Sequence, residues 1–304
     1  MGPAVSRVAG RDIEWPTLAL LAATYALWAV ATTLLAGLLL PLGIALAALA
    51  AAQHSSLQHE ALHGHPFRHP GWNAATVFPA LGLFVPYGRF RDLHLAHHRT
   101  PELTDPHDDP ESNYLDPAVW AGLSRPVRAL LRANNTLLGR MLLGPAISLA
   151  VFLRGDLQAL GAGDRAVRTA WAWHLLAVGM VLAWLATVGQ MPLWAWVLAS
   201  YLAMSLLKIR TFLEHQAHLR ATGRTAIIED RGPLALLFLN NNLHVVHHMH
   251  PRLPWYRLPS VYAAQRDRFL ARNGGYVYRS YADVFRRHLL RAKDPVPHPL
   301  RPQG

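Results

Sequence analysis

Residues 58–65 read QHEALHGH. This stretch overlaps the end of a run of 45 residues, from Trp15 to His59, that contains no Asp, Glu, Lys or Arg. A second uncharged run covers the 39 residues from Thr169 to Leu207. A helix needs about 20 apolar residues to cross a bilayer, so each run is long enough for two crossings. Prolines interrupt both runs near the middle, in LLLPLG at 38–43 and GQMP at 189–192. The sequence therefore predicts two helical hairpins, hence four transmembrane helices.

The composition agrees with a protein of the membrane. Apolar residues make up 52% of the 304 residues and charged residues 15%, whereas about 25% of an average soluble domain is charged. Helical hairpins buried in a large soluble protein are the alternative interpretation. The chain has no cysteine, which excludes disulfides, thiolate metal ligands, cysteine nucleophiles and a cysteine-held iron–sulfur cluster. Any electrons that this protein uses must come from elsewhere.

The basic residues predict an orientation. All 29 Lys and Arg lie in the segments 1–14, 60–168 and 208–304, which share one side of the membrane if each uncharged run is a hairpin. The positive-inside rule makes that side cytoplasmic, with both termini. The net charge of +11 can meet anionic headgroups or an acidic partner. No recognisable nucleic-acid module accompanies the charge, so we expect no nucleic-acid partner.

We expect the fold class to be an all-α integral membrane protein, in which a cytoplasmic helical cap covers the four transmembrane helices. The expected helices are 17–40, 42–63 and two more within 169–207. The segment 73–87 is short and contains two prolines, so we expect it at the membrane interface. Arginines and leucines alternate at helical spacing over 123–144, which predicts either an amphipathic helix on the membrane surface or an ordinary solvated helix face.

The domain organisation is simple. The sequence shows no internal repeat and no linker, so we expect a single domain over 1–304, with its core at about 50–265 and a flexible tail at 294–304.

Histidines are numerous and clustered. The chain has 18, and H-x-x-H-H occurs twice. Residues three and four apart share one face of a helix, so this spacing directs two or three imidazoles into one space. A fourth segment, TFLEHQAH, adds His215 as a candidate. Three boxes contain the other candidates: His59 and His63; His94, His97 and His98; His244, His247 and His248.

HEALH also fits H-E-x-x-H, the zinc protease pattern, in which His59 and His63 would bind zinc and Glu60 would be the general base. Such a site uses three protein ligands and a water. Nine imidazoles are too many for one zinc and indicate two metal ions. Imidazole binds iron, zinc, copper and nickel alike, so ligand type alone does not choose the metal.

Four segments, HEALHGH, HLAHHR, FLEHQ and NNNLHVVHHMHPRLPWYRLP, resemble the three-histidine-box fatty acid desaturases and their relatives, the membrane hydroxylases and carotenoid ketolases. The likeness covers roughly residues 50–265. It implies a non-haem diiron centre held by the eight box histidines, and FLEHQ suggests His215 as a further ligand. Glu60 then becomes an acceptor that orients a metal-bound imidazole rather than a base.

Other polar residues are candidates for the same orienting role. The acids of the loop at 105–111 are suited to it or to docking, and a solvated loop explains them equally well; they are Asp105, Asp108, Asp109 and Glu111. Asn241 is a candidate near the third box, although an Asn-rich helix start explains it as well.

The resemblance implies a desaturase that uses O2 and two electrons to insert a C=C bond into an acyl lipid. A hydroxylase or β-carotene ketolase would share every ligand, and an intramembrane zinc protease is the alternative from another class. We expect no bound haem or flavin, an external donor such as a ferredoxin with its reductase, and a location in the bacterial inner membrane.

Overall fold

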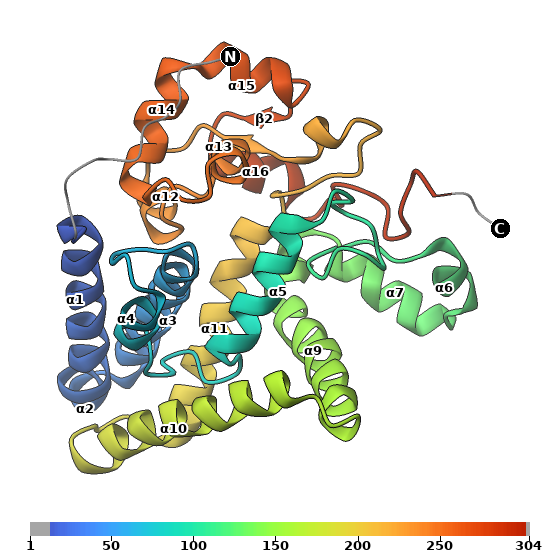
Figure 1. Ribbon diagram of the computed structural model, residues 1–304. Helices are drawn as coiled ribbons and strands as arrows, with labels where there is room; N and C mark the ends of the chain where they lie inside the picture. The colour runs from blue at the N-terminus through green and yellow to red at the C-terminus, as the bar shows by residue number, and fades with distance from the viewer. Residues whose placement is uncertain (1–12, 302–304) are drawn as a thin grey trace.

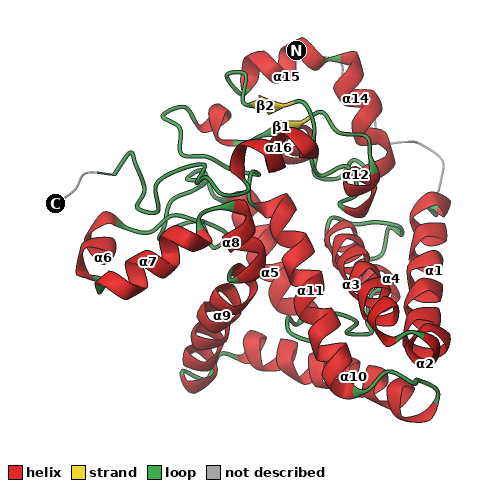
Figure 2. Ribbon diagram, turned by 180° about the vertical axis from the view of Figure 1, so that it is seen from behind, coloured by secondary structure: helices red, strands yellow, loops and turns green. Residues whose placement is uncertain are grey.

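Four long helices form the apolar part of the structure, a computed structural model that describes residues 13–301 (Figures 1 and 2). Each is long and apolar enough to cross a membrane, which confirms the four helices expected from the uncharged runs. The first is α-helical at both ends and π-helical between them. The four are α1 (Trp15–Val30) continued by η1 (Ala31–Leu35) and α2 (Ala36–Leu38); α3 (Leu40–Leu62); α10 (Arg165–Thr187); and α11 (Leu193–Thr211).

Small side chains let these helices approach closely. α3 packs against both α1 and α11, and fully buried alanines line the contact, among them Ala47 and Ala51 on α3 and Ala199 on α11. A Cβ at Gly43 would lie 2.9 Å from the carbonyl oxygen of Ala31, so only glycine fits there. Small residues at helix contacts are typical of membrane proteins, in which close van der Waals packing holds helices together.

The long helix α10 packs mainly against helices other than its hairpin partner α11. α10 crosses the end of the molecule opposite the cap (Figures 1 and 2) and packs against α9 (Gly144–Gly161) and α5 (Tyr87–Arg99). Its outer face is apolar and exposed, as at Trp173 and Leu175, which suits contact with lipid. Its far end reaches η1, where the indole of Trp184 donates to the hydroxyl of Thr32 at 3.0 Å.

A buried ion pair fixes α5, the helix of the second box. The guanidinium of Arg89 on α5 lies 2.8 Å from a carboxylate oxygen of Asp156 on α9, and the indole of Trp171 on α10 donates to the other oxygen at 2.8 Å. Asp156 is 2% exposed. One carboxylate therefore ties three helices together.

The expectation of a single amphipathic helix over 123–144 is wrong. The segment forms α7 (Arg125–Asn134) and α8 (Leu137–Leu142), preceded by α6 (Pro117–Gly122). The break lies at Thr136, whose hydroxyl caps α8 by accepting from the backbone N–H of Gly139 at 3.0 Å. The buried Arg140 turns back to the carbonyl of Asn134 at 3.1 Å. Burial of this arginine within an apolar pattern was not predictable from the spacing of the leucines.

Short elements build the cap over one end of the long helices (Figure 2). A two-stranded parallel sheet pairs β1 (Ile227–Ile228) with β2 (Val277–Tyr278). The helix α4 (Pro70–Thr76) overlaps only the start of the segment expected at the interface, 73–87. The remaining elements are η2 (Ala221–Arg224), α12 (Pro233–Leu237), α13 (His244–Met249), η3 (Trp255–Arg257), α14 (Leu258–Ala264), α15 (Arg266–Arg272) and α16 (Tyr281–His288).

The C-terminal segment makes defined contacts where a flexible tail was expected. Within its described part, 294–301, Pro297 pairs with Leu115 in a β-bridge, and Arg301 forms an ion pair with Asp105. These contacts hold the segment against the loop at 100–116, which carries the acids singled out in the sequence. Flexibility stays a prediction for 302–304, which lie outside the described residues.

Candidate metal centre

Four elements converge to bring the nine candidate histidines together. The end of α3 supplies His59 and His63, α5 supplies the second box, and the short helix α13 supplies the third. His215 comes from the irregular segment that follows α11. Their ring nitrogens form two groups, and within each group the nitrogens lie within 4.8 Å of one another. The first group is His59, His63, His94, His98 and His247, and the second is His97, His215, His244 and His248.

Each H-x-x-H-H box serves both groups. On α5, positions i and i+4 (His94 and His98) join the first group and position i+3 (His97) joins the second. On α13 the assignment is reversed, since only His247, at i+3, joins the first group. The two groups therefore lie next to each other, and the rings of His98 and His248 stack with centroids 4.2 Å apart.

The nitrogen spacing fits metal ions. Five Nε2–Nε2 distances are 3.0–3.1 Å. Imidazole binds an ion such as zinc at about 2.0–2.1 Å, so two ligand nitrogens of one ion lie about 2.8–3.0 Å apart at right angles and about 3.3–3.4 Å apart at the tetrahedral angle. Hydrogen bonds do not account for the pattern. Three Nε2–Nε2 contacts link His97, His215, His244 and His248 in a chain. Each ring nitrogen either donates one proton or accepts, so at most two of these three contacts can be hydrogen bonds.

Carboxylates on the far side of the rings fix where the protons are. The Nδ1 of His97 donates to Asp109 at 2.7 Å and the Nδ1 of His94 to Glu111 at 2.8 Å. Since a carboxylate only accepts, the Nδ1 of each ring carries a proton, and in the neutral ring the Nε2 keeps its lone pair and directs it into its group. The residues thus fit a pair of metal ions.

His244 is oriented by an amide and a second carboxylate. Its Nδ1 lies 3.2 Å from the side-chain oxygen of Asn241, which was a candidate from the sequence, and 3.7 Å from Glu214. The amide of Asn241 donates to Glu214 at 2.9 Å, and Arg210 pairs with the same carboxylate. Glu214 was missed, although it directly precedes His215 in the FLEHQ segment.

Burial keeps most of these imidazoles neutral. Burial, followed by the neighbouring imidazoles, lowers the pKa of His98 to about 3 and the pKa of His247 well below its usual value. His97 differs: burial opposes its charged form, but its hydrogen bond to Asp109 and the nearby acids raise its pKa above the usual value. Neutral imidazoles are the form that binds metals.

The other two candidates for orienting a ligand lie elsewhere. The carboxylate of Glu60 accepts from the backbone N–H of Trp255 at 2.8 Å and lies 4.0 Å from His65. Asp105 accepts from the guanidinium of Arg301 at 3.1 Å and from the backbone N–H of His107 at 2.9 Å. The loop at 105–111 thus turns Asp109 and Glu111 toward the histidines, and its first acid toward the C-terminal segment.

Two cavities lie near the histidine groups, and the larger one reaches them. One, of about 170 Å³, lies among α3, α5 and α11, and its wall includes Phe90, whose ring centroid is 5.8 Å from that of His94. The other, of about 1130 Å³, opens beside the cap and is lined by His63, His98 and His248.

Comparison with known proteins agrees with this geometry. No curated protein matches the chain. A family match covers residues 32–281 and is described as fatty acid desaturase. The match includes all nine histidines of the two groups and three of the four long helices in full. The chain therefore belongs to the fatty acid desaturase family, a family of non-haem diiron oxidoreductases.

Proposed function

We propose that this protein is a membrane acyl-lipid desaturase, which inserts a C=C bond with O2 and two electrons at a diiron centre held by the nine histidines. The observation that carries the proposal is the pair of histidine groups, of five and four ring nitrogens, in each of which the nitrogens lie within 4.8 Å of one another. Iron bound there would supply, from O2, the oxidant that an unactivated C–H bond requires. The protein's own residues would orient the imidazoles and, by burial, keep most of them neutral.

The smaller cavity is suited to an alkyl chain. It lies between the apolar helices α3 and α11, where Ala51, Ala203 and Leu207 contribute to its wall. Phe90 stands between this cavity and the first histidine group, since its ring is 6.5 Å from His59 and 5.8 Å from His94. A chain in the cavity would therefore end one side chain away from the metal centre.

The larger cavity is suited to the polar end of the substrate. Exposed arginines at 68, 99 and 252 line it, next to histidines of both groups. Guanidinium groups bind phosphate and carboxylate well. In this proposal the cap, both termini and the metal centre face the cytoplasm of a bacterium, and the inner membrane supplies the lipid.

We further propose that the electrons come from a separate acidic carrier such as a ferredoxin, which its own reductase supplies. The net charge of +11 favours such a partner. The helix α7 has no buried residue and carries Arg125, Arg128 and Arg132, so it offers a basic docking surface.

Mass spectrometry of total lipids and carotenoids from an expressing host tests the proposal. Cells that receive the protein and an electron donor should contain a species two hydrogens lighter than its precursor. The variant His94→Ala should lack it, whereas His107→Ala, an exposed histidine paired with Asp116, should keep it. A species that gains one oxygen instead would make the protein a hydroxylase, and a keto-carotenoid would make it a ketolase. Profiles identical to the empty host would refute the desaturase assignment.

The geometry gives no support to the zinc protease alternative. That reaction needs the carboxylate of Glu60 beside a metal-bound water, but Glu60 holds the backbone N–H of Trp255. His59 and His63 also lie in a group of five imidazoles.

A further inference from the structure

His215 is held differently from the other eight histidines. Those lie on α3, α5 and α13 or at the end of α3, whereas His215 lies in an extended segment. On one side this segment pairs with 224–225: His215 forms a β-bridge with Thr225, and Gln216 donates its N–H to the carbonyl of Arg224 at 3.0 Å. A helix fixes its side chains through its own backbone hydrogen bonds, so an extended ligand segment needs support from elsewhere.

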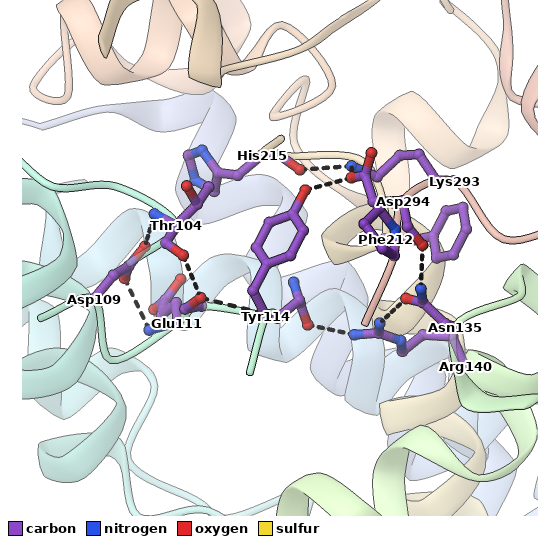
Figure 3. A pocket seen from close by; sticks show the side chains of 13 residues that line it. Thr104, Asp109, Glu111, Tyr114, Asn135, Arg140, Phe212, His215, Lys293 and Asp294 are labelled. Atoms are coloured by element: carbon purple, nitrogen blue, oxygen red, sulfur yellow. Dashed lines mark hydrogen bonds and ion pairs between the residues drawn. The ribbon is translucent and has the colours of Figure 1, made fainter. Parts of the chain in front are cut away.

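Two side chains supply that support on the other side (Figure 3). The ammonium of Lys293 donates to the backbone carbonyl of His215 at 2.9 Å. The hydroxyl of Tyr114 accepts from the backbone N–H of Ala217 at 2.9 Å. Tyr114, from the loop at 100–116, and Lys293, directly before the C-terminal segment at 294–301, thus hold the backbone on either side of Gln216.

Asp294 joins the two supports. Its carboxylate accepts from the hydroxyl of Tyr114 at 2.5 Å and pairs with the ammonium of Lys293. Its backbone carbonyl accepts from the side-chain amide of Asn135 at 2.5 Å. Lys293 is 11% exposed, and a buried ammonium is costly without a partner, so the carboxylate keeps the cation beside His215.

We propose that Tyr114, Lys293 and Asp294 are positioning residues for His215, so that the C-terminal segment is part of the metal centre. This inference rests on the proposed function, since it takes His215 to be a metal ligand. The family match ends at residue 281, so Lys293 and Asp294 lie outside it, whereas Tyr114 and all nine histidines lie within it.

The physical consequence is specific to the second group. Without Asp294, the ammonium of Lys293 has lost its charge partner and moves toward water, and the hydroxyl of Tyr114 loses its acceptor. The carbonyl of His215 then loses a donor, and the imidazole loses its fixed direction. Loss of such supporting contacts typically lowers metal affinity by about 10–100-fold.

Metal affinity measured on the full-length protein in detergent tests the inference. Metal-free protein is titrated with Fe²⁺ under anaerobic conditions, in competition with a chelator, and the bound metal per chain is counted. The wild type should bind two ions. Asp294→Ala should bind one ion normally and the other about 10–100-fold more weakly, and Tyr114→Phe should weaken the same ion. Asp267→Ala, whose carboxylate is fully exposed, serves as the control and should match the wild type.

A double-variant cycle separates positioning from a general loss of stability. If Asp294 acts through His215, then Asp294→Ala should cause no further loss of affinity in a His215→Ala background. An equal loss in both backgrounds, or wild-type affinity in Asp294→Ala, would overturn the inference while leaving the proposed function intact. A wild type that binds no pair of ions would refute both.

Discussion

Replacement of Asp109 by Asn is the most informative change at the metal centre. The carboxylate is 1% exposed and meets three N–H donors. One oxygen accepts from His97 at 2.7 Å and from the backbone N–H of Glu111 at 2.9 Å, and the other accepts from the backbone N–H of Thr104 at 2.8 Å. Asparagine has the same shape, but one of the two oxygens becomes an NH2 group. Whichever way the amide turns, a donor faces a buried donor.

The expected magnitude follows from these contacts. A buried donor without its acceptor costs about 1–3 kcal/mol, and a hydrogen bond to a charged group contributes about 1.5–3 kcal/mol. If the strain falls on His97, the second group loses a comparable free energy of metal binding. About 1.4 kcal/mol corresponds to a factor of ten in affinity, so we expect a loss of about 10–100-fold, in agreement with known effects of supporting residues.

The assay is chelator competition for the more weakly held ion, with Asp108→Asn as the control. Asp108 is the neighbouring residue in the same loop and is exposed, so its amide should leave both affinities unchanged. Thermal unfolding of the metal-free forms monitors the fold. The reasoning is refuted if Asp109→Asn binds both ions as tightly as the control, because His97 would then not depend on this carboxylate.

Three further predictions concern stability, docking and pH. Asp156→Ala should lower the free energy of unfolding by about 3–5 kcal/mol, since Arg89 stays buried without its partner; an unchanged melting temperature in detergent would contradict this. Arg125→Glu with Arg128→Glu, on α7, which has no buried residue, should raise KM for an acidic electron donor at low salt and leave the metal content unchanged; equal KM values would exclude α7 as the docking surface. Because the pKa of His98 is lowered from 6.5 to about 3, the unfolded chain binds more protons than the folded chain between these values, so the metal-free protein should lose stability as pH falls below 6.5. A melting temperature equal at pH 7.5 and 5.5 would disprove this linkage.

The long helices and the histidine boxes were predictable because both are local patterns. An uncharged run of 45 residues is by its length alone sufficient to predict two membrane crossings. The spacing H-x-x-H-H predicts that the histidines share one face of a helix. The division of a box between two groups was not predictable, since it depends on how α5 and α13 face each other in space. Each box alone is compatible with all its imidazoles in one group.

The sequence also did not predict which acid of the loop at 105–111 would contact a histidine of the metal centre. Asp105 and Asp109 are both acids of one polar loop, and nothing in their order distinguishes them. The structure separates them through a turn in which Thr104 has a φ of 73° and through Arg301, which binds Asp105 from a distant part of the chain. Long-range contacts of this kind leave no local sequence signal.

The reversed use of the two H-x-x-H-H boxes has a consequence for how this sequence can change. Each added residue in a helix turns the following side chains by about 100° and moves them by about 1.5 Å. One insertion between His94 and His97 would therefore move ligands of both groups out of place at once. The residues between the ligands, such as Ala96 and Val245, are not in either histidine group, so their side chains are not fixed by a metal site. Substitutions there are tolerable wherever packing allows, whereas the length of each box is fixed by two metal sites simultaneously.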